Sequence, residues 1–194
     1  MLIDFNNLPD TSRIWVYQCN RKFTPQELEY IQAKTRYFLT QWTAHGTELE
    51  AGFEIKYDRF IVLGLNQENA SASGCSIDAS VHFIQELQQK MDVDLLDKMD
   101  VTYYNGAFIA HKSLLDFRKM AKNKSVSANT IVFNNLVNTK ADLLKKIWEV
   151  NEDINTHTLE THMYRLRLKL NKIEPNLSFS LLNQNGLYCM KDNV

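Results

Sequence analysis

Apolar residues near the C-terminus recur at helical spacing. At about 100° per residue, Leu159, Met163, Leu166 and Leu170 project within about 60° of one another, which predicts a helix docked on a core over residues 158–172. The opposite face is basic, because the last twelve residues of this helix hold four cations and no carboxylate. Such a face can lie against phosphates while a few side chains reach base edges. A basic face that is merely solvated is the alternative.

The first part of the chain shows the patterns of short strands and capped helices. A run of β-branched and aromatic residues predicts a strand at residues 14–19. Thr24 and Glu27 match a capping box with Pro25 at the first helical position, and they predict a helix that Gly46 ends. The other predicted elements are hairpin strands at 53–57 and 60–65 around Asp58 and Arg59, a polar loop at 66–74, a helix at 77–91, hairpin strands at 101–104 and 107–111 around Asn105 and Gly106, and a helix at 114–122.

These elements predict an α+β fold class, with an antiparallel sheet and covering helices in one domain at residues 1–137. A second, shorter module at residues 138–194 follows this domain. With 194 residues and 44% hydrophobic side chains, the chain can bury one sizeable core or two small ones.

The charge of the chain supports nucleic-acid binding only locally. The formal net charge is −1, and residues 1–137 carry 14 Lys and Arg against 16 Asp and Glu. Residues 138–194 carry 8 against 7, so only the C-terminal part is basic, and only slightly. The electrostatic case for nucleic acid therefore rests on the basic helix face alone.

The sequence lacks the marks of membrane and secreted proteins. No apolar run approaches the roughly 20 residues that span a bilayer, and the first residues show no basic and apolar signal region. Cys19, Cys75 and Cys189 are odd in number and have no CxxC spacing, so we expect neither a disulfide framework nor a zinc knuckle. We expect a cytoplasmic protein that does not contact a membrane.

The segment THTLETHMYRLRLKL, residues 156–170, is followed by Gly186 and Tyr188. With these residues, the stretch 140–190 resembles the second half of the winged-helix DNA-binding domain of OmpR/PhoB-type response regulators. The resemblance implies a truncated winged helix-turn-helix unit. Its parts would be a support helix at 141–150 with Leu143, Leu144, Ile147 and Trp148 facing inward, a turn at 151–155, a recognition helix at 158–172, and a wing hairpin at 178–190 folded back at residues 183–186.

The same resemblance implies roles for individual side chains. Thr161 and Arg165 stand at positions that face the major groove, where a methyl group touches thymine and a guanidinium reads guanine. Contacts to the phosphate backbone are implied for Thr158, His162 and Arg167. The implied DNA-binding set also includes Lys169, Lys172 and, in the wing, Gln184.

This chain departs from the family pattern at several positions. Gln184 stands where an arginine often enters the minor groove, Leu168 replaces a polar or basic residue, and Leu187 and Cys189 replace a glycine and an arginine around Tyr188. The sheet and first helix that begin the family's domain are not recognisable before residue 140. We therefore expect the chain to bind double-stranded DNA weakly.

The stretches DTSRIWVYQCNR, RFIVLGL and SGCSIDASVHFIQEL give residues 1–140 a resemblance to an uncharacterised family of small Bacteroidetes proteins, often labelled ABC transporter ATPases. The chain has no GxxxxGK[ST] phosphate cradle and its six glycines are scattered, so we expect no ATP hydrolysis. Both resemblances include residues 138–141. A gene fusion and an assembly error that joined two reading frames are both compatible with this overlap.

The most enzyme-like cluster lies around Cys75, between Ser73 and His82. A thiol beside a helix N-terminus with a histidine nearby is the pattern of a cysteine nucleophile. Asp78 and His82 are equally an ordinary pair at positions i and i+4 of one helix, and Ser76 with Asp78 serves as a helix cap. We therefore expect a structural role for this cluster.

The five histidines show no HExxH or other metal-ligand spacing, so we expect no metal and no cofactor. His45, which precedes Gly46, is expected at the C-terminal end of a helix. Together with Trp42 it is also placed to line a pocket.

The sequence thus predicts a DNA-binding, transcription-regulator-like protein that acts through a C-terminal winged helix and is not an enzyme. The expected partner is double-stranded DNA, and a homodimer is left open. The alternative function is that of a cytosolic α+β protein that does not bind DNA.

Overall fold

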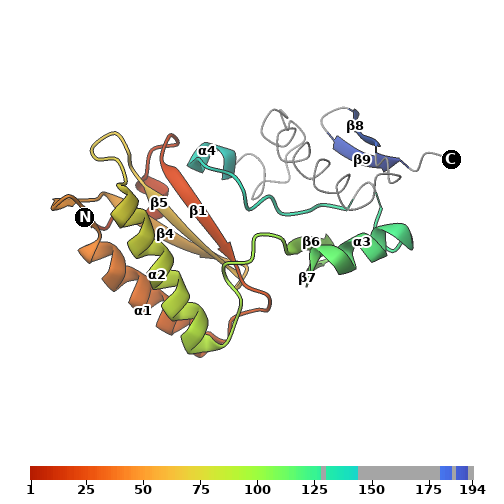
Figure 1. Cartoon of the computed structure of the whole chain (residues 1–194), viewed down its shortest axis with the longest axis horizontal. Helices are drawn as coiled ribbons and strands as arrows, with labels where there is room; N and C mark the ends of the chain where they lie inside the picture. Colours follow the sequence, from red (N-terminus) through yellow and green to blue (C-terminus); the bar gives the residue numbers. More distant parts are fainter. Residues whose placement is uncertain (128–129, 144–179, 185–186, 192–194) are drawn as a thin grey trace. The chain divides into compact units, whose positions relative to one another are not determined.

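The structure is a computed structural model that describes residues 1–127, 130–143, 180–184 and 187–191 (Figure 1). Contacts within the chain define two compact units. Unit 1 comprises Met1–Asp100 and Asn135–Leu144, and unit 2 comprises Val101–Asn134 and Lys145–Val194. Within the described residues, no helix is long and apolar enough to cross a membrane.

An antiparallel three-stranded sheet forms the centre of unit 1. Across the sheet the strands follow the order β1 (Arg13–Gln18), β5 (Phe60–Leu65) and β4 (Ala51–Lys56). The central strand β5 is buried at every position, so both faces of the sheet are covered. The predicted α+β class, with an antiparallel sheet and covering helices, is confirmed for this unit.

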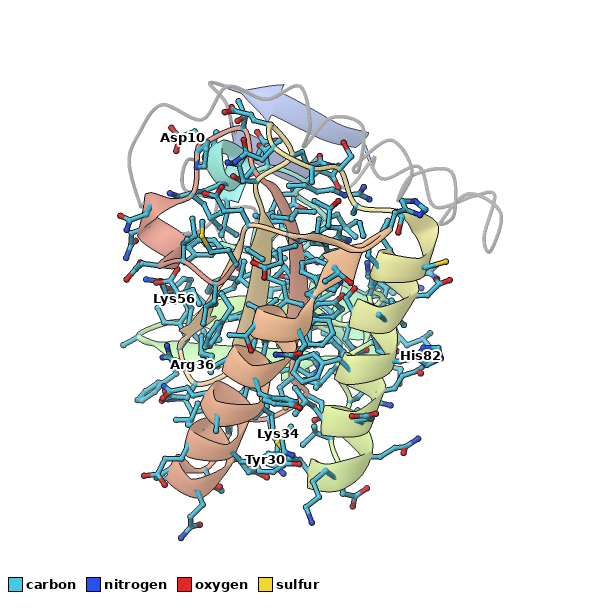
Figure 2. The ribbon with its side chains drawn as sticks, turned by 90° about the vertical axis from the view of Figure 1, so that its left-hand side faces the viewer. Asp10, Tyr30, Lys34, Arg36, Lys56 and His82 are labelled. Atoms are coloured by element: carbon cyan, nitrogen blue, oxygen red, sulfur yellow. The ribbon has the colours of Figure 1, made fainter. Side chains whose placement is uncertain are left out.

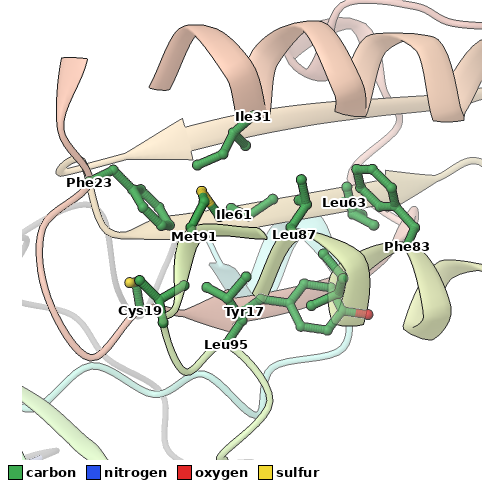
Figure 3. Close-up of a cluster of buried hydrophobic side chains, with 12 residues drawn as sticks. Tyr17, Cys19, Phe23, Ile31, Ile61, Leu63, Phe83, Leu87, Met91 and Leu95 are labelled. Atoms are coloured by element: carbon green, nitrogen blue, oxygen red, sulfur yellow. The ribbon is translucent and has the colours of Figure 1, made fainter. Parts of the chain in front are cut away.

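Helices α1 (Pro25–Gln41) and α2 (Gly74–Met91) cover one face of the sheet, and Figure 2 shows them side by side in front of the strands. Phe38 of α1 and Phe83 of α2 stack with their ring centroids 4.5 Å apart, which joins the two helices. A cluster of buried apolar side chains fills the space between helices and sheet (Figure 3). Its members include Tyr17, Ile61 and Leu63 from the strands and Ile31, Ile84 and Leu87 from the helices.

The 3-10 helix η1 (Phe5–Asn7) packs on the opposite face of the sheet. Gly52 of β4 and Gly64 of β5 lie directly opposite each other where it packs. A Cβ on Gly64 would lie 2.5 Å from the Leu8 side chain, and one on Gly52 would lie 2.9 Å from the Ile3 carbonyl oxygen. Glycine at both positions therefore allows this close approach.

Residues 135–143 pack along the edge of β1. The amide of Ile14 donates to Asn138 at 3.0 Å, and the amide of Lys140 donates to Ser12 at 2.9 Å. Between these bonds, Arg13 and Thr139 form an antiparallel bridge. Val137 and Leu143 are buried, so apolar packing accompanies the backbone pairing.

The side chain of Lys140 is buried in unit 1, where the residue is only 5% exposed. Its ammonium group donates to the carbonyl oxygens of Asn6 at 2.7 Å and Leu8 at 2.5 Å. It also lies 5.8 Å from the centre of the Phe5 ring. No carboxylate forms an ion pair with it in the described part of the chain, so these carbonyls compensate the buried charge.

Unit 2 begins with the hairpin of β6 (Val101–Asn105) and β7 (Phe108–Lys112), followed by α3 (Leu114–Lys122). Residues 131–133 extend the hairpin, because the Tyr104 amide donates to Ile131 and the Phe133 amide donates to Thr102, both at 2.9 Å. The predicted strands and helix are confirmed here.

The expected single sheet, built from all three groups of strands, is wrong. Strands β6 and β7 pair with each other and do not join the sheet of unit 1. Both edges of that sheet are already engaged, since residues 138–140 line β1 and Leu2 forms a parallel bridge with Ala51 of β4. This long-range pairing leaves no edge for the hairpin.

Helix α1 ends earlier than predicted. It stops at Gln41, and the strands β2 (Thr43–Ala44) and β3 (Thr47–Glu48) form a small hairpin around His45 and Gly46. Both turn residues have positive φ, 51° and 80°, as in a two-residue type I′ turn. The expectation that His45 ends a helix is therefore wrong, because the chain turns inward at the buried Trp42 before it reaches His45.

Three further boundaries differ from the predictions. Helix α2 begins at Gly74, because Ser73 accepts a hydrogen bond from the Ser76 amide at 3.2 Å, so the cap is Ser73 and not Ser76 with Asp78. The β6–β7 turn lies one residue later than expected, because Asn105 pairs with Phe108. The β4–β5 loop has three residues, Tyr57 to Arg59, because Lys56 pairs with Phe60.

The predicted capping box of α1 is confirmed. The Thr24 amide donates to Glu27 Oε2 at 2.7 Å, and the Glu27 amide donates to Thr24 Oγ1 at 3.3 Å. Arg21 adds a bidentate pair to the same carboxylate, with distances of 2.8 and 2.7 Å. These hydrogen bonds, first of all those from Arg21, lower the pKa of Glu27 to about 2.

We predict that Glu27→Gln lowers the free energy of unfolding by about 1 kcal/mol at pH 7 because it removes the charge while keeping the shape. The pKa of Glu27 is lowered in the folded state, so this stabilisation is present above about pH 5 and is lost as the pH falls toward 2. Urea unfolding of both proteins at pH 7, 4 and 3 measures the gap, and exposed Glu29→Gln is the control. A gap that is constant with pH would contradict the ion pair.

We predict that Lys140→Met lowers the free energy of unfolding by about 1 to 3 kcal/mol, because the carbonyls of Asn6 and Leu8 lose their donor. Exposed Lys98→Met is the control and should stay within about 0.5 kcal/mol of wild type. Urea unfolding followed by tryptophan fluorescence reports both effects. Equal stability of the Lys140 variant and wild type would show that the buried ammonium group contributes nothing.

Candidate functional site

Most of the predicted DNA-binding residues lie outside the described residues. These are Thr158, Thr161, His162, Arg165, Arg167, Lys169 and Lys172. Gln184 is described through its backbone and is the last residue of β8 (Ser180–Gln184). Their roles stay predictions.

A hairpin occupies the place of the predicted wing. Strand β8 pairs antiparallel with β9 (Leu187–Lys191), from Ser180 opposite Lys191 to Gln184 opposite Leu187. The chain was expected to fold back from residue 183 onward, but strand pairing continues to Gln184. Only residues 185 and 186, which are outside the described residues, separate the two strands.

The start of the predicted support helix lies in unit 1. Helix α4 (Lys140–Leu143) begins where that helix was expected, and Thr139 caps it by accepting the Asp142 amide at 3.1 Å. Leu143, which was predicted to face inward, is fully buried. The later residues of the support helix are outside the described range.

A cavity of about 400 Å³ lies where the end of α1 meets the start of α2. Trp42 and His45 line it, as the sequence pattern suggested, together with Phe38, Ser73, Cys75 and Ser76. Trp42 is held in place because its indole nitrogen donates to the Ser76 carbonyl at 2.8 Å. Cys75 and His45 are both exposed, so the cavity opens to solvent.

The structure does not bring Cys75 and His82 together. They are seven residues apart on α2, which separates them by about 10 Å along the helix axis. Figure 2 shows His82 projecting outward from α2. The histidine that does share a cavity with Cys75 is His45. The sequence placed His45 at a pocket with Trp42 but did not relate it to Cys75, and the available signal was the His-Gly pair of the turn.

Cys19 is a poor candidate for chemistry. Its thiol is fully buried, and burial raises its pKa, although the nearby guanidinium groups of Arg21 and Arg59 act in the opposite direction. Arg59 is itself 6% exposed and donates to the Cys19 carbonyl at 2.9 Å. Both side chains therefore serve the packing of the β4–β5 loop against β1. No cluster of His, Cys, Asp and Glu side chains that could hold a metal ion occurs among the described residues.

A family model described as "Transcriptional regulatory protein, C terminal" matches residues 134–179. The match covers the predicted support and recognition helices and supports a DNA-binding, transcription-regulator-like role for this segment. Its first residue, Asn134, belongs to unit 2, residues 135–144 belong to unit 1, and the remaining residues belong to unit 2. No curated protein and no solved structure matches the chain.

We predict that a thiol reagent labels Cys75 at least 100-fold faster than Cys19 in the folded protein with Cys189→Ser, because only Cys75 is accessible. Exposure alone explains this difference. The test for a Cys–His pair is therefore His45→Ala, which should leave the labelling rate of Cys75 within about twofold. A tenfold slower reaction would indicate that His45 activates the thiol.

Proposed function

We propose that this chain binds double-stranded DNA through its C-terminal segment and acts as a transcription-regulator-like protein. The family match at residues 134–179 is the observation that carries this proposal. It contains the predicted basic helix face, with Arg165, Arg167, Lys169 and Lys172 and no carboxylate after Glu160 within that helix. Four cations on one helix can neutralise several phosphates.

In this proposal Thr161 and Arg165 contact base edges in the major groove. Thr158, His162 and Arg167 bind the phosphate backbone, and Lys169 and Lys172 add charge to the same contact. The pairing of β8 with β9 supports a wing hairpin that follows the recognition helix. Gln184 is then the wing residue nearest the DNA.

Unit 2 supports this proposal with elements that the sequence did not relate to DNA binding. The family's domain begins with a small sheet and a helix, and residues 101–134 form a hairpin, an added strand segment and α3. Contacts group these residues with residues 145–194 in one compact unit. We infer that they supply the apolar partner which the stripe of the recognition helix requires.

We predict that binding to a random-sequence duplex falls with salt, with a slope of log K against log salt near −3, because three or four phosphates are neutralised. Arg165→Ala should cost about 1 to 3 kcal/mol on a preferred duplex and relax its selection, whereas Lys172→Ala should weaken all duplexes alike. Fluorescence anisotropy at several salt concentrations measures both quantities.

The matched control is Lys22→Ala, which removes an exposed charge from unit 1 and should leave binding unchanged. Absence of binding by the wild-type chain at low salt would overturn the proposal. That result would favour the alternative function, an α+β protein that does not bind DNA.

A further inference from the structure

Helix α3 presents a basic face in unit 2. Residues 112–124 carry five Lys and Arg and a single carboxylate, Asp116. Lys112, Lys119, Lys122 and Lys124 are all exposed. The wider charge distribution follows the same trend, since residues 101–194 carry 13 Lys and Arg against 8 Asp and Glu, whereas the first 100 residues carry 9 against 15.

The packing of α3 fixes which side of the helix faces outward. The Phe117 ring contacts Tyr103 of β6 with the centroids 5.0 Å apart, and Met120 Sδ accepts from the Tyr103 hydroxyl at 3.6 Å. At about 100° per residue, Lys119 and Lys122 project roughly opposite to Phe117. The apolar side of α3 therefore packs on the hairpin, and the exposed Lys119 and Lys122 lie on the other side of the helix.

Asp116 is the single carboxylate among residues 112–124, so it offsets one of their five positive charges. It accepts a hydrogen bond from Lys119 at 2.9 Å, and the contacts with Lys119 and Ser113 lower its pKa. Lys112 ends β7 and directly precedes Ser113, the N-cap of α3, so it lies next to the first turn of this helix. The four exposed lysines are therefore parts of one basic surface that runs from β7 to the residue just beyond α3.

An exposed aromatic ring stands on the same side of the hairpin. Ala110 of β7 lies opposite Tyr103, and directly opposed residues of an antiparallel pair point to the same face. Phe108 and Ala110 are two residues apart, so Phe108 also points to the face on which α3 packs. Phe108 is 78% exposed, although an apolar ring of this size is usually buried.

We propose that Lys112, Lys119, Lys122, Lys124 and Phe108 form a second DNA-contacting surface, in which the lysines bind backbone phosphates and the ring enters the minor groove. This inference rests on the proposed function and adds a contact outside the family-matched segment. Positive charge beside an exposed aromatic ring complements a polyanion with apolar base and sugar surfaces. The other partner that these lysines would complement is unit 1, whose first 100 residues are acidic, in the same chain or in a second copy.

The test compares the full chain with the triple variant K119Q/K122Q/K124Q in anisotropy titrations with random duplex DNA at several salt concentrations. The C-terminal helix alone accounts for a slope of log K against log salt near −3, so the two surfaces together predict a slope of about −6 for the full chain. Three lost phosphate contacts should make this slope shallower by about 2 to 3. The matched control is K22Q/K90Q/K98Q, which removes three exposed lysines from unit 1 and should leave the slope unchanged. Phe108→Ser should weaken binding about fivefold or more with an unchanged slope and an unchanged Tm.

Comparison with Arg165→Ala separates this inference from the proposed function. If Arg165→Ala weakens binding but the triple variant behaves as wild type, the second surface is wrong and the proposed function holds. If only the triple variant weakens binding, the second surface holds and binding through the C-terminal helix is wrong. A wild-type chain that does not bind DNA overturns both. Tighter DNA binding by the triple variant would indicate that these lysines pair with acidic unit 1, and this also overturns the inference.

Discussion

The buried ammonium group of Lys140 is the interaction on which the arrangement of unit 1 depends. A charge in a protein interior is tolerated only where polar groups replace its water, and here the carbonyls of Asn6 and Leu8 do so. Those carbonyls are in place only if η1 lies close on the sheet, and that approach requires glycine at positions 52 and 64. The first residues of the chain, two glycines in the sheet and a lysine 134 residues after Asn6 thus form one connected arrangement.

This arrangement includes the beginning of the segment that the family model matches. The segment with transcription-regulator similarity begins at residue 134, and its residues 135–144 belong to unit 1. The helix that begins at Lys140 therefore takes its N-terminal cap and its first buried leucine from the α+β unit. A substitution that destabilises unit 1 will therefore also weaken the capping and the packing of the first turn of this helix. The domain boundary expected from the sequence, between residues 137 and 138, falls within residues 135–144, which all belong to unit 1.

Local signals allowed much of unit 1 to be predicted from the sequence. The capping box at Thr24 and the strands around Arg59 depend on neighbouring residues, and both were predicted because such patterns are short. The turn at His45 was missed because the residues before it have a helical pattern. The helix ends there because Trp42 is buried and its indole donates a hydrogen bond to Ser76, 34 positions away, which no local pattern indicates. The role of Lys140 was missed for the same reason, since nothing near it in sequence distinguishes a buried lysine from a solvated one. For the candidate site, the sequence allowed the C-terminal segment and its resemblance to a regulator family to be recognised. The basic surface on α3 could be identified only from the structure, because the contact of Phe117 with Tyr103 shows which side of the helix is covered.

The backbone pairing between residues 138–140 and β1 has a consequence for the solubility of the protein. An uncovered edge strand offers its amides and carbonyls to any other extended chain, and β1 is rich in β-branched and aromatic residues. Residues 138–140 cover this edge from within the same molecule. A chain cut before residue 138 would expose β1 as a template for intermolecular sheet growth, so the C-terminal segment also protects the N-terminal unit against aggregation.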